Sequence, residues 1–141
     1  MKNNLTFSML KPEILQNKQV GPIITMIEQA GFTIKALKLT HLNAASAGQF
    51  YAVHQARPFY QDLCQYMSSG PIIAMVLEKD QAVKDFRTLI GATNPAEADP
   101  GTIRKQFGKS IDANAIHGSD APETALAEAQ FFFPAVMSTM Q

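Results

Sequence analysis

The run PIIAMVL at residues 71–77 is apolar at almost every position and lies between Gly70 and Glu78. A near-continuous apolar run of this length is typical of a central strand with both faces covered. We therefore predict that it forms the middle of a sheet with other elements packed on each face. The run is too short to cross a bilayer, and no other segment has the length to do so.

Two further segments have strand patterns. Residues 5–10 (LTFSML) alternate between apolar and polar side chains and are soon followed by a proline, which stops a strand. Residues 32–39 (FTIKALKL) are similar, but the apolar phase slips between Ala36 and Leu37, which indicates a β-bulge. Residues 115–119 (AIHGS) are short and predict only a strand end.

Apolar residues at helical spacing separate these strands. We predict helices at residues 20–30, 44–54, 59–67, 80–90 and 121–133, with Asn43, Asp80 and Asp120 as N-caps and Gly31 and Gly91 as C-terminal stops. Residues 92–113 have no clear period and are predicted to form a long loop. Helices interleaved with strands indicate an α/β or α+β sandwich, with helices packed on a small sheet.

The chain has 141 residues, and we expect residues 1–141 to fold as one domain. Its 12 basic and 12 acidic residues cancel, so there is no global attraction to nucleic acid or to a membrane surface. The single Cys64 can form no internal disulfide, and the N-terminus lacks the apolar core of a signal peptide. We expect a cytoplasmic protein with no membrane or nucleic-acid partner.

Three common kinds of reactive site have weak support. The segment GTIRKQFGKS at residues 101–110 is similar to a phosphate-binding P-loop, but six residues separate its glycines where the motif needs four. His41, His54 and His117 are scattered without metal-ligand spacing. Ser119 lacks the GxSxG context of a serine hydrolase.

His117 stands out because of its neighbours in NAIHGSD, residues 114–120. Gly118 permits a backbone geometry that a side chain would obstruct, and Pro122 soon starts a helix. The imidazole is therefore expected at a junction between a strand and a turn. Two interpretations stay open at this point. His117 is either a core residue whose ring nitrogens are hydrogen-bonded inside the protein, or an accessible residue that takes part in a reaction.

Longer stretches of the sequence favour the second interpretation. They are FSMLKPE, GFTIKALKL, FYAVHQARPFY, YMSSGPIIAMVLE, FRTLIGATNPAEADPGTIR and NAIHGSD. In order and spacing, from about residue 4 to residue 133, they resemble the nucleoside diphosphate kinase family. The resemblance implies a ferredoxin-like α/β (α+β) sandwich, whose small four-stranded antiparallel sheet is covered by helices.

The resemblance also implies an activity. Such enzymes transfer the terminal phosphoryl group of a nucleoside triphosphate, mainly ATP, to nucleoside diphosphates by a ping-pong mechanism, and His117 would be the residue that is phosphorylated. The alternative is a non-catalytic nucleotide-binding or scaffold protein on the same fold. An imidazole, with an ordinary pKa of about 6.5, is largely uncharged at neutral pH and needs no general base. Orientation by Glu128 on the last predicted helix would suffice.

The same resemblance assigns the remaining roles. The catalytic residues would be His117 and Glu128 together with Lys11 and Tyr51. The phosphates would be bound by Lys11, Arg87, Arg104 and Thr93, and the ribose by Asn114 and Lys11. The base would be bound by Phe59, Leu63 and Ile111. Magnesium is implied as the cofactor, held mainly by nucleotide phosphates without a protein metal site. A homo-oligomer, either a tetramer or a hexamer, is implied as well.

This sequence departs from the family pattern at a few positions. Glu13 stands where an aspartate is usual, and Ala129 and Phe131 stand where a larger aliphatic residue and a tyrosine are common. We expect these changes to affect packing and not the chemistry.

Overall fold

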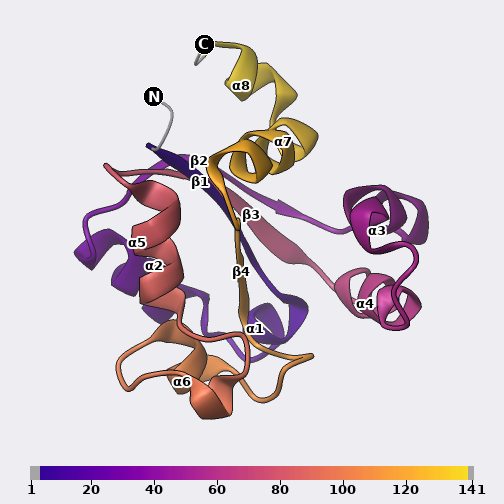
Figure 1. Cartoon of the computed structure of the whole chain (residues 1–141), viewed down its shortest axis with the longest axis horizontal. Coiled ribbons are helices and arrows are strands. Elements are labelled where there is room, and N and C mark those ends of the chain that lie inside the picture. The colour runs from indigo at the N-terminus through magenta and orange to yellow at the C-terminus, as the bar shows by residue number, and fades with distance from the viewer. Residues whose placement is uncertain (1–3, 140–141) are drawn as a thin grey trace.

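The structure is a computed structural model, and it describes residues 4–139 (Figure 1). Within this range the strands form one four-stranded sheet in the order β2-β3-β1-β4, and every neighbouring pair is antiparallel. The strands are β1 (Leu5–Leu10), β2 (Thr33–Thr40), β3 (Ile72–Glu78) and β4 (Ile116–Gly118). The predicted sandwich with a small antiparallel sheet is confirmed.

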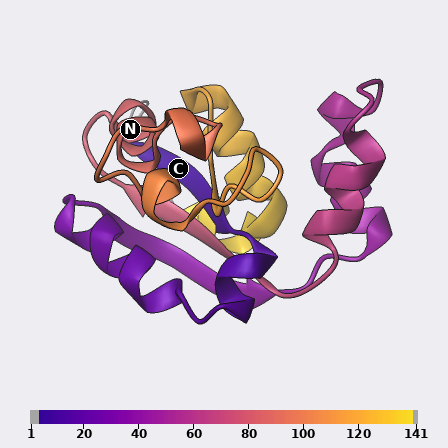
Figure 2. The same ribbon diagram turned by 90° about the horizontal axis from the view of Figure 1, so that it is seen from below.

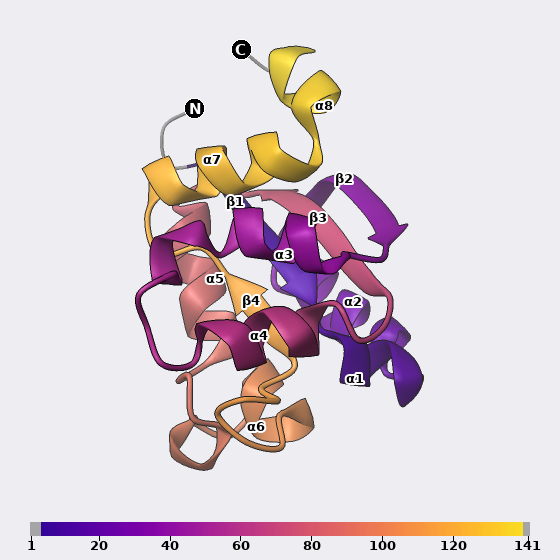
Figure 3. The same ribbon diagram turned by 90° about the vertical axis from the view of Figure 1, so that its right-hand side faces the viewer.

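Helices cover both faces of this sheet. They are α1 (Pro12–Gln16), α2 (Val20–Gln29), α3 (Ala44–Phe50), α4 (Tyr60–Met67), α5 (Ala82–Ile90), α6 (Ile103–Phe107), α7 (Pro122–Phe132) and α8 (Pro134–Thr139), with short 3₁₀ turns η1 (Ala52–His54) and η2 (Pro95–Glu97). Figure 2 shows α3 and α4 set to one side of the sheet, and Figure 3 shows α7 lying across it. No helix among the described residues has the length and apolar composition that a membrane crossing requires.

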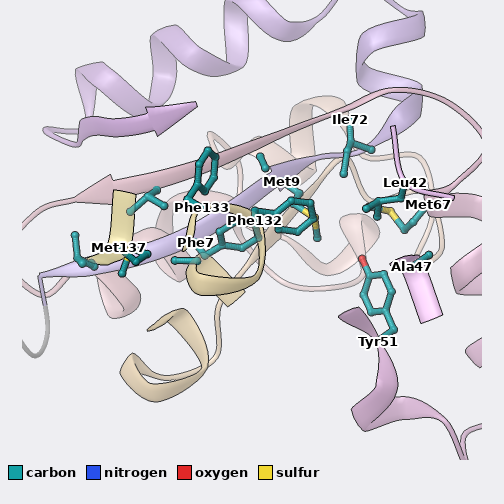
Figure 4. Close-up of a cluster of buried hydrophobic side chains, with 14 residues drawn as sticks. Phe7, Met9, Leu42, Ala47, Tyr51, Met67, Ile72, Phe132, Phe133 and Met137 are labelled. Carbon is teal, nitrogen blue, oxygen red and sulfur yellow. The ribbon is translucent and has the colours of Figure 1, made fainter. Parts of the chain in front are cut away.

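The apolar run at residues 71–77 lies in β3, an inner strand of the sheet. Its residues are buried from Ile72 to Leu77. Alternate side chains enter two different cores: Ala74 and Val76 pack with α7 and α8, whereas Met75 and Leu77 pack with α2 and α5. Figure 4 shows the first of these cores, which includes Phe7 of β1. The prediction of a strand covered on both faces is confirmed.

The edge strand β2 contains the predicted β-bulge. Its pairing with β3 shifts register between Ile34 and Ala36, so Lys35 is the additional residue. The bulge therefore lies slightly before the phase slip in the apolar pattern. Gly31, just before this strand, was predicted to end the preceding helix, and it has φ of 98°, a conformation that favours glycine at a helix end.

Some boundaries differ from the predictions. The predicted loop at 92–113 contains α6, which has only five residues and is too short to show a period. Helix α8 was not predicted either. Asp80 and Asp120 are not N-caps, since Gln81 and Ala121 occupy those positions. The carboxylate of Asp120 instead accepts a hydrogen bond from Arg87. The N-cap predicted at Asn43 is confirmed.

Candidate active site

His117 lies in the middle of the short strand β4, opposite Met9 of β1. Gly118 explains how this strand approaches the neighbouring helix α5. A Cβ atom at Gly118 would lie 2.9 Å from a methyl group of Ile90 and 3.1 Å from the ring of Phe86. Glycine is therefore required here for close packing against α5. The special backbone geometry that was expected at Gly118 is not the reason, because its φ is not positive.

The imidazole of His117 is held on one side by a carboxylate. Its Nε2 atom is 2.9 Å from Oε1 of Glu128, and the two side chains are 23% and 19% exposed. A carboxylate only accepts hydrogen bonds, so in the uncharged imidazole Nε2 carries the hydrogen and Nδ1 keeps its lone pair. The hydroxyl of Ser119 donates to the same carboxylate oxygen at 2.7 Å. Among residues 4–139, nothing is hydrogen-bonded to Nδ1.

Lys11 and Asn114 form a second, buried part of the site. The ammonium of Lys11 donates to Oδ1 of Asn114 at 2.6 Å, and Nδ2 of Asn114 donates to the carbonyl of Thr93 at 3.1 Å. Burial, and then the positive charge of Arg104, lower the pKa of Lys11 to about 8, against the opposite effect of Glu13. The ammonium therefore loses its charge at a lower pH than an ordinary lysine.

The residue after Asn114 has an unusual backbone. Ala115 has φ of 77°, which is uncommon for a residue with a side chain. The N–H of Ile116 donates to the carbonyl of Asn114 at 2.9 Å, so the three residues form a γ-turn. A conformation of this kind costs roughly 1–3 kcal/mol and persists only where the surrounding structure imposes it. It lies between the Lys11–Asn114 pair and His117.

Two arginines approach the other side of the same segment. Arg104 is buried and donates to the carbonyls of Gly91 at 3.0 Å and Ile116 at 2.7 Å. Burial, and then the charge of Arg87, lower the pKa of Arg104 to about 10. Arg87 is about half exposed and pairs with Asp120 at 2.8 Å. Lys11, Arg104 and Arg87 thus contact positions 114, 116 and 120, on either side of His117 in the sequence.

Tyr51 ends helix α3 and is buried. Burial, and then the negative charge of Glu128, raise the pKa of its hydroxyl above the ordinary value, so the group stays protonated. Its ring packs edge-on against Phe50, at 4.9 Å between centroids, and Phe50 in turn lies 6.2 Å from the ring of His117. Tyr51 is therefore linked to His117 through the ring of Phe50.

The predicted base-binding residues lie on different elements. Phe59 directly precedes α4 and is 44% exposed, and its ring contacts His54 at 5.4 Å between centroids. Leu63 is partly buried on α4 and packs against the core. Ile111 is exposed in the loop before β4. None of the hydrogen bonds among the described residues joins these three side chains to His117, and the N–H of Leu63 donates to the carbonyl of Phe59 at 2.9 Å.

Four residues of the site were given no role in it by the sequence. Ser119 was considered only as a hydrolase nucleophile, and Asp120 only as a helix cap. The role of Ala115 depends on a backbone angle that no side-chain pattern reveals. Glu13 was expected to affect packing alone, but its Oε2 accepts a hydrogen bond from the N–H of Ala115 at 3.0 Å. Its departure from the family aspartate was the available signal.

The described residues contain no group of three or more His, Cys, Asp or Glu side chains that could hold a metal ion. A protein cage for a metal is therefore not present in residues 4–139. The same range offers the ammonium of Lys11 and two guanidinium groups, which suit a ligand that carries several negative charges.

A histidine held by a carboxylate, with cations bound to residues before and after it in the sequence, is suited to phosphoryl transfer. The sequence profile of the nucleoside diphosphate kinase family matches residues 4–137. The nucleoside diphosphate kinase of Flavobacterium psychrophilum is 57% identical over 133 residues, which are 94% of this chain and 96% of that protein. That of Trichlorobacter lovleyi is 55% identical, over 91% of this chain and 93% of that protein.

Solved structures agree with the sequence comparisons. The crystal structure of the Aquifex aeolicus nucleoside diphosphate kinase superposes with a TM-score of 0.92 at 43% identity, covering 95% of this chain and 97% of that one. The chain belongs to the nucleoside diphosphate kinase family. It is an enzyme of that family, and the predicted ferredoxin-like fold is confirmed.

Proposed function

We propose that this enzyme works through a phosphohistidine at His117. Its family membership gives the overall reaction, the transfer of the terminal phosphoryl group from a nucleoside triphosphate to a nucleoside diphosphate. The observation that supports the proposed route is the 2.9 Å contact of Nε2 with Glu128, because this contact leaves the Nδ1 lone pair free.

Each half of the cycle exchanges one bond for another. The Nδ1 lone pair attacks the terminal phosphorus of the triphosphate, the bond from phosphorus to the bridging oxygen breaks, and the diphosphate leaves with that electron pair. In the second half, a terminal phosphate oxygen of the acceptor diphosphate attacks the phosphorus, and the N–P electron pair returns to Nδ1. The phosphorylated ring is positively charged because Nε2 keeps its hydrogen, and the carboxylate of Glu128 offsets that charge.

Positive charge and hydroxyl groups would position the phosphates. Phosphoryl transfer depends mainly on positioning and on neutralising charge over the phosphate oxygens. We assign this task to Arg87, Arg104 and the exposed hydroxyl of Thr93. The bonds from Arg104 to two backbone carbonyls support the assignment, because they hold the guanidinium in place before a ligand arrives. Tyr51, protonated and close to Glu128, would donate a hydrogen bond near the reacting histidine.

The nucleoside would be held at its ribose and its base. Lys11 has two more N–H donors beyond its bond to Asn114, and Nδ2 of Asn114 has one, so the pair can bind ribose hydroxyl groups. The exposed ring of Phe59 would stack on the base, with Leu63 and Ile111 alongside. Stacking tolerates every base, because each base has an aromatic face.

Magnesium is the proposed cofactor, and it would neutralise charge on the nucleotide phosphates to which it is bound. The tetramer or hexamer stays a prediction, supported by Leu37 and Leu39, which are exposed on the edge strand β2. The cytoplasmic location also stays a prediction.

A coupled assay that converts GDP to GTP from ATP and magnesium tests the proposal. We expect turnover by the natural chain and none by His117→Gln. Nucleotide binding without turnover in the natural chain would instead support the non-catalytic alternative. Turnover by His117→Gln at the natural rate would exclude His117 as the nucleophile.

A further inference from the structure

We propose that Glu13 is a positioning residue, whose carboxylate holds the strained turn at Ala115 and thereby sets the ribose-binding pair Lys11–Asn114. The inference rests on the proposed function, since it assigns to Glu13 a part in the same site. In this proposal, Glu13 makes no contact with the nucleotide. It acts through the backbone of Ala115.

Both backbone polar groups of Ala115 are bound by one short segment at the start of α1. The N–H of Ala115 donates to Oε2 of Glu13 at 3.0 Å, and the carbonyl of Ala115 accepts from the N–H of Lys11 at 3.0 Å. These contacts join segments that lie 102 residues apart in the sequence. They fix the peptide planes on both sides of Ala115, which is what a backbone angle of 77° requires in order to persist.

The orientation of Asn114 depends on this turn. The Ile116 N–H closes the turn onto the carbonyl of Asn114 at 2.9 Å. The side chain of Asn114 then accepts from the ammonium of Lys11 at 2.6 Å. Lys11 therefore supports the turn with its backbone and meets Asn114 with its side chain. If the turn relaxes, the distance between the Lys11 ammonium and the Asn114 amide changes directly.

The second oxygen of the Glu13 carboxylate indicates that the side chain is more than a packing group. Oε1 of Glu13 is buried and has no hydrogen-bond partner within residues 4–139. A buried carboxylate oxygen without a partner is costly. An apolar residue of the same size would avoid that cost, so the bond from Oε2 to Ala115 is the feature that a carboxylate provides here.

The experiment compares two variants of similar size, Glu13→Gln and Glu13→Met. Glutamine can still accept a hydrogen bond from the N–H of Ala115, whereas methionine cannot. The readout is the ratio of kcat/KM for ATP to kcat/KM for 3′-deoxy-ATP as phosphoryl donors. This ratio measures how well the ribose hydroxyl is bound, and a general loss of stability or of active enzyme does not change it.

We expect Glu13→Gln to keep the natural ratio within about threefold and Glu13→Met to lower it by about 10- to 100-fold, the effect of a lost hydrogen bond to a charged group. Glu123→Ala is the matched control, because Glu123 also follows a proline in the first turn of a helix but is exposed. It should leave the ratio unchanged.

A second substitution tests the cause. Glycine adopts positive φ without steric cost, so Glu13→Met combined with Ala115→Gly should recover part of the lost discrimination. An unchanged ratio in Glu13→Met, or a lack of recovery in the double variant, would overturn the inference. Failure of the natural chain to form phosphohistidine would instead contradict the proposed function, and the two failures are therefore distinguishable.

Discussion

Glu128 contacts His117 at a single ring nitrogen, with 2.9 Å between Oε1 and Nε2. The same carboxylate oxygen accepts the hydroxyl of Ser119 at 2.7 Å. Ser119 is itself buried and bonded to β1, since its N–H donates to the carbonyl of Phe7 at 3.2 Å and its hydroxyl oxygen accepts from the N–H of Phe7 at 3.3 Å. The helix α7, the strand β4 and the strand β1 therefore act together on the orientation of one imidazole.

Replacing Glu128 by Ala should slow phosphorylation of His117 without preventing nucleotide binding. A hydrogen bond to a charged group is worth roughly 1.5–3 kcal/mol, which corresponds to about 10- to 150-fold in rate. Single-turnover labelling with ATP measures the effect, and Glu123→Ala serves as the control on the same helix. A natural labelling rate in Glu128→Ala would mean that the contact does not orient the ring.

Lys11 should impose opposite pH dependences on activity and on stability. Its pKa is lowered from 10.5 to about 8 in the folded protein, so kcat/KM should fall as the pH rises through about 8. Between pH 8 and 10.5 the unfolded chain binds more protons at this lysine than the folded chain does, so the free energy of unfolding should rise with pH. Denaturant titrations and kcat/KM profiles across this range measure both.

Two substitutions separate these effects. Lys11→Arg keeps the charge to higher pH and should move the fall in kcat/KM upward. Lys11→Met should remove the rise in unfolding free energy between pH 8 and 10.5. A fall in kcat/KM at the same pH in Lys11→Arg would assign the titration to another group.

The two arginines should differ in their effect on stability. Arg87 is about half exposed and pairs with an exposed carboxylate, and such pairs contribute little, about 0–1 kcal/mol. Arg104 is buried and satisfies two backbone carbonyls. Replacement of either by methionine should reduce kcat by about 10²–10³-fold, but only Arg104→Met should lower the thermal midpoint clearly. Scanning calorimetry measures the thermal midpoints of the two variants. Equal midpoints would contradict the predicted difference in stability.

Phe59→Ala should weaken nucleotide use without changing the fold. The ring is 44% exposed, and a stacked base contributes about 1–3 kcal/mol. We expect kcat/KM to fall for purine and pyrimidine nucleotides alike, while labelling of His117 by a small phosphoryl donor such as phosphoramidate stays unchanged. Loss of labelling by the small donor would show that Phe59 also supports the histidine.

The sequence predicted those parts of the molecule that depend on local patterns. The apolar run of β3 and the phase slip in β2 each have one physical cause, and both predictions are confirmed. The glycine beside His117 was expected for its backbone geometry, whereas close packing against α5 is what requires it. Helix α6 was missed because five residues do not complete a recognisable period. The cap at Asp120 was wrong because a distant arginine competes for that carboxylate.

The site residues also divide into those that a local motif predicts and those that depend on contacts between distant segments. His117, Lys11 and the arginines could be named from their motifs, and their positions around residues 114–120 became evident only from hydrogen bonds between distant segments. The turn at Ala115 depends on a backbone angle, and the bond from Glu13 spans most of the chain. Neither leaves a periodic or compositional trace in the sequence.

The central claim is that Nδ1 of His117 carries the phosphoryl group. The direct measurement is to label the protein with γ-³²P-ATP and magnesium, digest it in alkali and separate the two phosphohistidine isomers by chromatography. We predict acid-labile, base-stable label that migrates with the Nδ1 isomer and is absent from His117→Gln. Label in the Nε2 isomer, or equal labelling of His117→Gln, would contradict the account.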